Sequence, residues 1–389
     1  MQVDSHSRSD PQMYLTQALT SPQLPDELKP FYQAFERFWS NRLWFQLTRT
    51  IESFFAVPSS APYRIDLYES FIKDFALKLD PLKHASIAVA VARTYNDGTA
   101  AVSFLDTLLP TFDTPATREP FVLVSMERGH FLLLLGQPEA AKEAMDQCQK
   151  VLDQLDSVDL AVHASFYRVS GDYWKAKAEF ADYYRNSLLY LACIDIDRDL
   201  TQDERAERAR DLGIAALLGE SLYNFGELLL HPVLDSLKGT PNEYIRSLLF
   251  AFNKGDIDKF QSLIPELEKE PYLLQNLNTL RQKICVLALI EAVFKRPIQD
   301  RVALPFSIIA KEAQVPVDEV EHLVMKALML NLIRGTLDAC SSVASITWVQ
   351  PRVLDKTQIG GLKDRLGDWA DKVQAQGAFV RGVAPELFA

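Results

Sequence analysis

The sequence has little cysteine, and none of it is paired at metal-binding spacing. Four cysteines are scattered singly over 389 residues, and no CxxC motif occurs. This distribution indicates reduced thiols and disfavours a disulfide scaffold or a zinc finger. The polar N-terminus contains no apolar core of a secretory signal, and charge interrupts every long apolar run. We therefore expect a protein of the cytoplasm and nucleus that has no membrane segment.

Motifs of metal- and nucleotide-dependent catalysis are missing as well. None of the six histidines forms an HxH or HExxH pair, and neither a Gly-Lys dipeptide nor a GxSxG elbow occurs. The stretch DIDRDLTQDERAE resembles a calcium loop, but Leu200 and Ala206 stand where that loop needs Gly and Glu. We interpret it as an acidic turn before a helix capped by Thr201. The prediction is no enzyme, no cofactor and no metal.

An excess of basic charge is also lacking. The net charge is −11 and the isoelectric point is about 5.2. Nucleic-acid binders need clustered Lys and Arg, because neutralising phosphates supplies most of their affinity. The overall charge therefore disfavours a nucleic-acid partner, although a local basic patch stays possible at this point.

What the sequence does contain is helical periodicity. Five glycines, at 98, 136, 171, 219 and 255, follow apolar helical segments and precede amphipathic ones, at spacings of 38, 35, 48 and 36 residues. Glycine after a helix supplies the left-handed cap that lets the chain reverse. The pattern is typical of tetratricopeptide-like helix pairs, whose period is about 34 residues. An irregular helical domain with capping glycines is the alternative, and both interpretations are mainly α.

The pattern changes after residue 279. An apolar helix up to Pro297, a short helix with Ser307 as N-cap and a helix from Glu319 to about Leu330 with Asp318 as cap precede two strands. This succession predicts a winged helix with a small two-stranded wing. We expect a disordered segment at residues 1–12, helical repeats at 13–279, the winged helix at 280–355, and a terminal helix and tail at 356–389.

The second helix of this winged helix does not suit DNA. It is the helix that enters the major groove in DNA-binding relatives of the motif. Here it carries Asp318, Glu319 and Glu321 against Lys326 alone. Residues 281–340 contain eight Lys or Arg and seven Asp or Glu, without a basic stripe. We expect the motif to bind protein instead, with a free wing edge able to pair with another sheet.

The last helix, predicted from about Thr357 to Gln376, has a heptad seam. Its apolar residues are spaced 3, 4, 3 and 4 apart, as in coiled coils: Ile359, Leu362, Leu366, Trp369 and Val373. The seam either docks on its own domain or joins a helix bundle with other subunits. Gly360 and Gly361 disfavour helix by about 1 kcal/mol each, so the ordered helix is expected to begin near Leu362.

Several segments resemble PCI-domain proteins, and among them the proteasome-lid members in particular. The segments are RLWFQLT (42–48), LYNFGELLLHPVLDSL (222–237), LRQKICVLALIEAVF (280–294), VEHLVMKALMLNLIRGTLD (320–338), ITWVQPRVLD (346–355) and KDRLGDWADKV (363–373). The PCI family comprises scaffold subunits of the proteasome lid, the COP9 signalosome and translation initiation factor three. The resemblance implies a right-handed helical solenoid, a winged-helix PCI module with a small β wing, and a terminal helix.

The resemblance also implies a function. It implies a non-catalytic scaffold subunit of the lid that supports lid assembly and ATP- and ubiquitin-dependent degradation. The implied partners are other PCI subunits, the MPN-domain subunits of the lid and the ubiquitin receptor that bridges lid and base, with no nucleic acid and no membrane. The implied contact residues are Ile346, Trp348 and Val349 in the wing, together with the five seam residues. A PCI scaffold of a related complex is the alternative.

Overall fold

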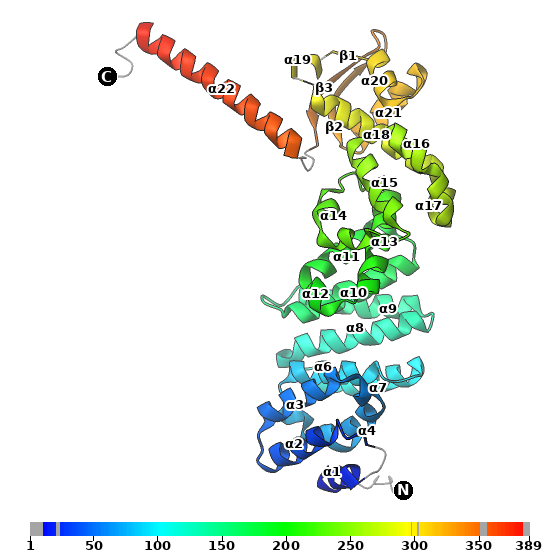
Figure 1. The fold of residues 1–389 in the computed structure, drawn as a ribbon, viewed down its shortest axis with the longest axis vertical. Coiled ribbons are helices and arrows are strands. Elements are labelled where there is room, and N and C mark those ends of the chain that lie inside the picture. The colour runs from blue at the N-terminus through cyan, green and yellow to red at the C-terminus, as the bar shows by residue number, and fades with distance from the viewer. Residues whose placement is uncertain (1–10, 21–23, 297, 302, 351–355, 384–389) are drawn as a thin grey trace. The chain divides into compact units, whose positions relative to one another are not determined.

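Helices dominate the fold, and one small sheet lies near the C-terminus (Figure 1). The computed structural model describes residues 11–20, 24–296, 298–301, 303–350 and 356–383. The chain divides into two units, Met1–Thr201 and Gln202–Ala389. This mainly α architecture with a late sheet confirms the predicted fold class.

The first unit is entirely helical within its described residues. Its first helix begins at Pro11, so two residues of the segment predicted to be disordered are helical, and residues 1–10 lie outside the described part. Its α-helices are α1 (Pro11–Thr20), α2 (Lys29–Ser40), α3 (Trp44–Ala56), α4 (Arg64–Leu67), α5 (Lys73–Phe75), α6 (Pro81–Ala92), α7 (Gly98–Phe112), α8 (Arg118–Leu134), α9 (Pro138–Leu152), α10 (Leu160–Ala176), α11 (Phe180–Cys193) and α12 (Ile196–Asp199).

Aromatic side chains fill the N-terminal end of this unit. Phe35 lies 5.7 Å from Phe54 and 6.1 Å from Phe71 between ring centroids, and Phe71 lies 5.0 Å from Phe75. All four rings are fully buried. Aromatic pairs at these separations stabilise a core beyond the effect of apolar burial alone. They join α2, α3 and the short helices around α5 into one apolar cluster.

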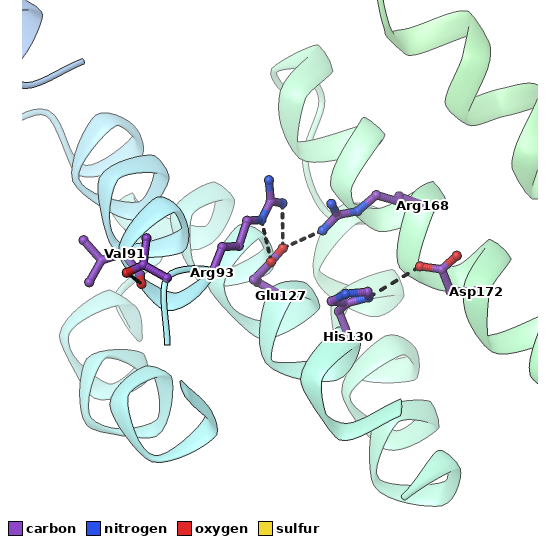
Figure 2. Close-up of polar contacts among 7 residues, drawn as sticks. Val91, Arg93, Glu127, His130, Arg168 and Asp172 are labelled. Carbon is purple, nitrogen blue, oxygen red and sulfur yellow. Dashed lines mark hydrogen bonds and ion pairs between the residues drawn. The ribbon is translucent and has the colours of Figure 1, made fainter. Parts of the chain in front are cut away.

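Further along the unit, successive helices pack in pairs, and an ion cluster around one buried carboxylate links α8 to α10 and to the C-cap of α6. Helix α8 packs against α6 and α10 as well as against α7 and α9. Glu127 of α8 is 1% exposed; its carboxylate accepts from Arg93 Nε at 2.7 Å and Nη2 at 2.9 Å, and from Arg168 Nη2 at 2.6 Å (Figure 2). Burial alone would raise the pKa of Glu127, but the two arginines outweigh it and hold that pKa below its usual value. The cluster therefore fixes the relative register of α6, α8 and α10.

The left-handed cap expected at five glycines is confirmed at two and wrong at three: Gly98 is the first residue of α7, and Gly219, which follows α13, has no positive φ. Gly136 after α8 has φ +76° and Gly255 after α15 (Glu243–Lys254) has φ +63°, the left-handed values expected of helix caps. Gly171 instead lies inside α10, where an added Cβ would touch Ser187 of α11. That glycine serves close helix packing, and Ala178, with φ 59°, takes the left-handed position that ends this helix.

The second unit contains the end of the repeats and the winged helix. Its helices and strands are α13 (Gln202–Leu218), α14 (Gly226–Leu230), α15, α16 (Ile257–Leu263), α17 (Pro271–Gln275), α18 (Leu277–Lys295), α19 (Ile298–Arg301), β1 (Leu304–Pro305), α20 (Phe306–Ala313), α21 (Val317–Met329), β2 (Ile333–Asp338), β3 (Val343–Val349) and α22 (Lys356–Val383).

The winged helix has the predicted helices and one more strand than predicted. Helices α18, α20 and α21 pack together beside an antiparallel sheet of order β1-β3-β2. The sequence did not predict strand β1, because two residues are too few to show the alternation of apolar and polar side chains that indicates a strand. The predicted caps are wrong: α20 begins at Phe306, before Ser307, and α21 begins at Val317, with Asp318 inside its first turn.

A single buried lysine joins α18 to the end of α13. Lys283 of α18 is 4% exposed, and its Nζ donates to the carbonyl oxygens of Ala216 at 2.9 Å, Leu217 at 2.9 Å and Gly219 at 2.7 Å. These carbonyls end α13, where helical backbone lacks intrahelical donors and the dipole is negative. The rings of Tyr223 and Phe225 each lie 5.4 Å from the same nitrogen.

The geometry around Lys283 matches the ammonium form. Burial lowers the pKa of Lys283 to about 7. However, a neutral amine has only two N–H donors, whereas three carbonyl oxygens converge here and an ammonium supplies three. Two aromatic faces and a helix C-terminus favour the cation further. We conclude that Lys283 acts as a charged cap for α13.

His84 is a buried titratable side chain of the first unit. His84 on α6 is 6% exposed, and its Nε2 lies 2.8 Å from the hydroxyl of Tyr68. The ring of Phe112 lies 5.2 Å away between centroids. Burial lowers the pKa of His84 from 6.5 to about 4. The folded state therefore holds this imidazole neutral at physiological pH.

We expect Lys283→Met to destabilise the second unit by about 3 kcal/mol, because buried carbonyls left without a donor cost about 1–3 kcal/mol each. Urea denaturation measures the change. The matched control is Lys295→Met on the same helix, where the side chain is 68% exposed and lies 3.6 Å from Glu291; its effect should stay within about 0.5 kcal/mol. Equal stability of the two variants would show that Lys283 does not cap α13.

We expect the protein to lose stability in acid through His84. The folded pKa lies below the unfolded one, so this contribution is complete above pH 6.5 and is lost as pH falls toward 4. The loss should reach about 1 kcal/mol near pH 5.5 and about 3 kcal/mol near pH 4. His84→Gln should flatten the unfolding free energy measured by urea denaturation across this window. His322→Gln, at an exposed position on α21, should leave the wild-type slope unchanged, and an equal slope in all three proteins contradicts the expectation.

Candidate functional site

The wing contains a β-bulge that divides the predicted contact residues. Arg334 pairs with Trp348, whereas the next residue, Gly335, pairs with Ile346, so Thr347 is the extra residue of β3. Its hydroxyl donates to the carbonyl of Arg334 at 3.2 Å. Glycine is required at 335, because an added Cβ would collide with the carbonyl oxygen of Ser345. A bulge of this kind reverses the inward and outward alternation of a strand.

This reversal corrects one predicted contact residue. Ile346 is 2% exposed and lies in the core of the winged helix. Trp348 has the same strand parity, yet the bulge turns it outward, where it is 37% exposed and the Arg334 guanidinium lies 4.8 Å from its ring centroid. Val349 is half-buried opposite Ile333. Of the three wing residues, Trp348 is the one whose side chain offers an exposed apolar surface.

The predicted free edge of the wing is also placed differently. Strand β3 is the middle strand, paired to β2 along its length and to β1 through Ala344 and Val343. Helix α19 packs beside β3 as well. The outer strand on the other side of the sheet is β2, and residues 346–349 of β3 have β2 as their strand partner.

The exposed face of α21 is acidic and apolar. Asp318, His322, Met325 and Met329 are spaced 4, 3 and 4 residues apart and are all exposed. The two methionines are 43% and 74% exposed. Lys326 is directed elsewhere, with its Nζ 2.8 Å from Gln282 Oε1 of α18. A phosphate backbone would be repelled by this face, whereas flexible methionines are suited to protein partners.

Helix α22 presents the predicted seam to the surface. Ile359, Leu362, Leu366, Trp369 and Val373 are 53%, 40%, 58%, 65% and 50% exposed. The helix is longer than predicted, because it runs to Val383, and it contains Gly360 and Gly361, contrary to the expected start at Leu362. An added Cβ at either glycine would touch nothing within 4 Å. Five large apolar side chains on one exposed face leave an apolar patch in contact with water. Such patches mark sites where another protein binds.

Another exposed apolar group lies in the first unit, within the segment RLWFQLT. Trp44 stacks on Phe75 with ring centroids 5.5 Å apart, and Lys78 Nζ lies 4.9 Å above it. Phe45 is 75% exposed and, with Trp44, lines a groove of about 350 Å³. Sequence periodicity did not single out these residues, because an apolar residue on a helix reads equally well as core.

The acidic stretch after α11 forms a turn, as interpreted from the sequence. Asp195 caps the short α12 by accepting from the backbone N–H of Asp197 at 3.2 Å, and α13 begins one residue after Thr201. Among the described residues, no group of three or more His, Cys, Asp or Glu side chains could hold a metal ion. Likewise, no helix in the described ranges is long and apolar enough to span a bilayer.

His231, another residue with a potential ligand side chain, has a structural role. Its Nδ1 accepts from the backbone N–H of Val233 at 3.3 Å, directly after α14 ends at Leu230. Partial burial lowers the pKa of His231. His231 therefore caps the 3-10 helix Pro232–Leu237 that follows α14.

Two family models match the chain, one on each side of residue 255. The model described as PSD13 N-terminal repeats matches residues 31–249. The model described as PCI domain matches residues 261–346, which includes the winged helix up to the middle of β3. Together they agree with a chain in which helical repeats precede a PCI module.

Named relatives agree over nearly the whole chain. The 26S proteasome non-ATPase regulatory subunit 13 homolog A of Arabidopsis thaliana is 38% identical over 372 residues, 93% of this chain and 96% of the relative. The 26S proteasome regulatory subunit RPN9 of Saccharomyces cerevisiae is 37% identical over 90% of this chain and 92% of its own length. Eukaryotic translation initiation factor 3 subunit M of Aspergillus fumigatus is 23% identical over 44% of this chain.

Helical repeats, the winged helix and the long terminal helix thus coincide with matches that extend over nine-tenths of the sequence. The resemblance to PCI-domain proteins of the proteasome lid is confirmed, and the chain belongs to the family of the 26S proteasome non-ATPase regulatory subunit 13.

Proposed function

We propose that this protein is a non-catalytic scaffold subunit of the lid of the 26S proteasome regulatory particle. It supports lid assembly and thereby ATP- and ubiquitin-dependent protein degradation. Family membership supports the placement. The observation that supports this mechanism is the exposed apolar seam of α22. Contact with another chain would remove this apolar surface from water, which is favourable.

The scaffold acts through surfaces rather than through a reaction. Its partners are the other PCI subunits and the MPN-domain subunits of the lid, and the ubiquitin receptor that bridges lid and base, in the cytoplasm and nucleus. The seam of α22, Trp348 and the exposed face of α21 support contacts with protein, because each of these surfaces presents exposed apolar side chains. The segment boundaries at residues 12, 279 and 355 stay predictions.

A scaffold of a related PCI complex is the second placement. One observation favours it, the match to a translation initiation factor subunit, but that match covers less than half of the chain. Affinity purification of the tagged full-length chain followed by mass spectrometry separates the two placements. Recovery of proteasomal ATPases supports the lid, whereas recovery of initiation factor subunits without them supports the alternative.

We expect deletion of the residues after Lys356 to leave the folded body intact and to abolish incorporation into the lid. Burying the five large seam side chains contributes on the order of 8–15 kcal/mol before ordering costs. Native gels of cell extracts measure incorporation, and circular dichroism of the purified variant checks folding.

Substitutions in the full-length chain test whether the apolar side chains of the seam, and not only the presence of α22, are needed for assembly. Leu366→Asp with Trp369→Asp should behave like the deletion, whereas Asp364→Ala with Asp371→Ala, on the opposite face, should assemble normally. Normal lid incorporation of the truncated chain refutes the role of α22.

A further inference from the structure

The seam of α22 is longer than its five predicted residues and includes one polar position. Because the helix continues to Val383, the same heptad extends through Gln376, Val380 and Val383. The a positions are then 359, 366, 373 and 380, and the d positions are 362, 369, 376 and 383. Val380 is 38% exposed and Val383 is 68% exposed. Gln376, also exposed, is the single polar residue among these eight positions.

The charges beside this seam are of one sign. In the same heptad, Lys363 occupies an e position, and Arg365 and Lys372 occupy g positions, directly next to the apolar stripe. Asp364 and Asp371 lie on the far side of the helix at f, whereas Asp368 at c lies next to the basic g positions. All six side chains are exposed. The e and g residues of a helix face the flanks of its partner and determine which partner it accepts.

This pattern disfavours a second copy of the chain as partner. In an antiparallel pair the g positions of one helix face the g positions of the other, and e positions face e. Arg365 and Lys372 would therefore face basic side chains of the second copy. In a parallel pair they would face the e positions Ala370 and Gly377, which offer no carboxylate. We call Lys363, Arg365 and Lys372 the basic flank of the seam. Neither arrangement neutralises this flank, and like charges across a helix interface are destabilising.

The basic flank instead favours a partner helix of opposite charge. We propose that α22 takes as partner an amphipathic helix of a different chain, one with Asp or Glu at the positions beside its apolar seam. The partner also presents a hydrogen-bonding side chain opposite Gln376, because a buried amide needs its donors and acceptors satisfied. One polar residue in an apolar seam fixes the register of helix pairing, so Gln376 sets where along α22 the partner docks. This inference rests on the proposed function and specifies the partner of the same surface.

Charge reversal tests the partner's chemistry. The variant Lys363→Glu, Arg365→Glu, Lys372→Glu reverses the flank in the full-length chain. Its control, Asp364→Lys, Asp371→Lys, reverses the two charges at the f positions on the far face. Lid particles purified from cells depleted of this chain serve as binding partner in both cases. We expect the flank variant to bind about tenfold or more weakly, because three attractions become repulsions, and the control to stay within about twofold.

Salt and oligomeric state give independent measurements. Added salt should weaken binding of the wild type and strengthen binding of the flank variant, since screening reduces attraction and repulsion alike. The wild-type chain alone should sediment as a monomer in analytical ultracentrifugation. A dimer that is lost on deletion of the residues after Lys356 would overturn the proposal in favour of a second copy.

The outcomes also separate this inference from the proposed function. If the deletion abolishes incorporation while the flank variant binds like its control, the acidic partner is wrong and the scaffold role stands. If the deletion incorporates normally, the scaffold role of α22 falls, and the charge variants no longer bear on assembly. Loss of binding in the flank variant alone supports both. Equal weakening of both charge variants overturns the partner's chemistry, because the effect would then not depend on the flank.

Discussion

The second unit depends on one buried cation at the end of one helix. Lys283 gives its three donors to the carbonyls that end α13, so the last repeat helix and the first helix of the winged module share a charge-assisted joint. Hydrophobic contacts are not directional and allow small shifts of α18. Three hydrogen bonds donated by one nitrogen, in contrast, define a single position. The loop from Tyr223 to Phe225 closes over the same nitrogen with two rings. The winged helix is thereby fixed to the end of α13 with little freedom.

A fixed winged helix is of use to a scaffold because its surfaces are then presented at defined positions. The motif's shape is shared with DNA-binding proteins, but its chemistry here is different. Acidic and methionine side chains occupy the exposed face of α21, and a bulge turns Trp348 outward while Ile346 completes the core. The same shape therefore carries protein-binding surfaces, which illustrates that a site's residues, and not its fold, determine what it binds.

The sequence predicted helices and the winged helix well, because long periodic segments carry many concordant signals. It failed where one residue decides the outcome. Gly171 follows the same pattern as the capping glycines, yet its missing Cβ allows α11 to approach α10, which depends on a contact between helices. Ile346 and Trp348 have the same strand parity, yet the extra residue Thr347 places one in the core and the other at the surface. Neither the packing contact nor the bulge has a signature in the local sequence.

The seam of α22 was recognisable from the sequence, but its extent was not, because glycines in the helix argued for a shorter element. Five glycines, at 360, 361, 367, 377 and 382, lie within its 28 residues. Each lowers helix stability by about 1 kcal/mol relative to alanine, and at residues 359–383, where burial is described, α22 has no buried side chain to offset this. Such a helix gains most of its stability from the helix it binds. Its ordering and its recruitment then become one event, so a partner with the wrong flanking charges would lose affinity and helix stability together.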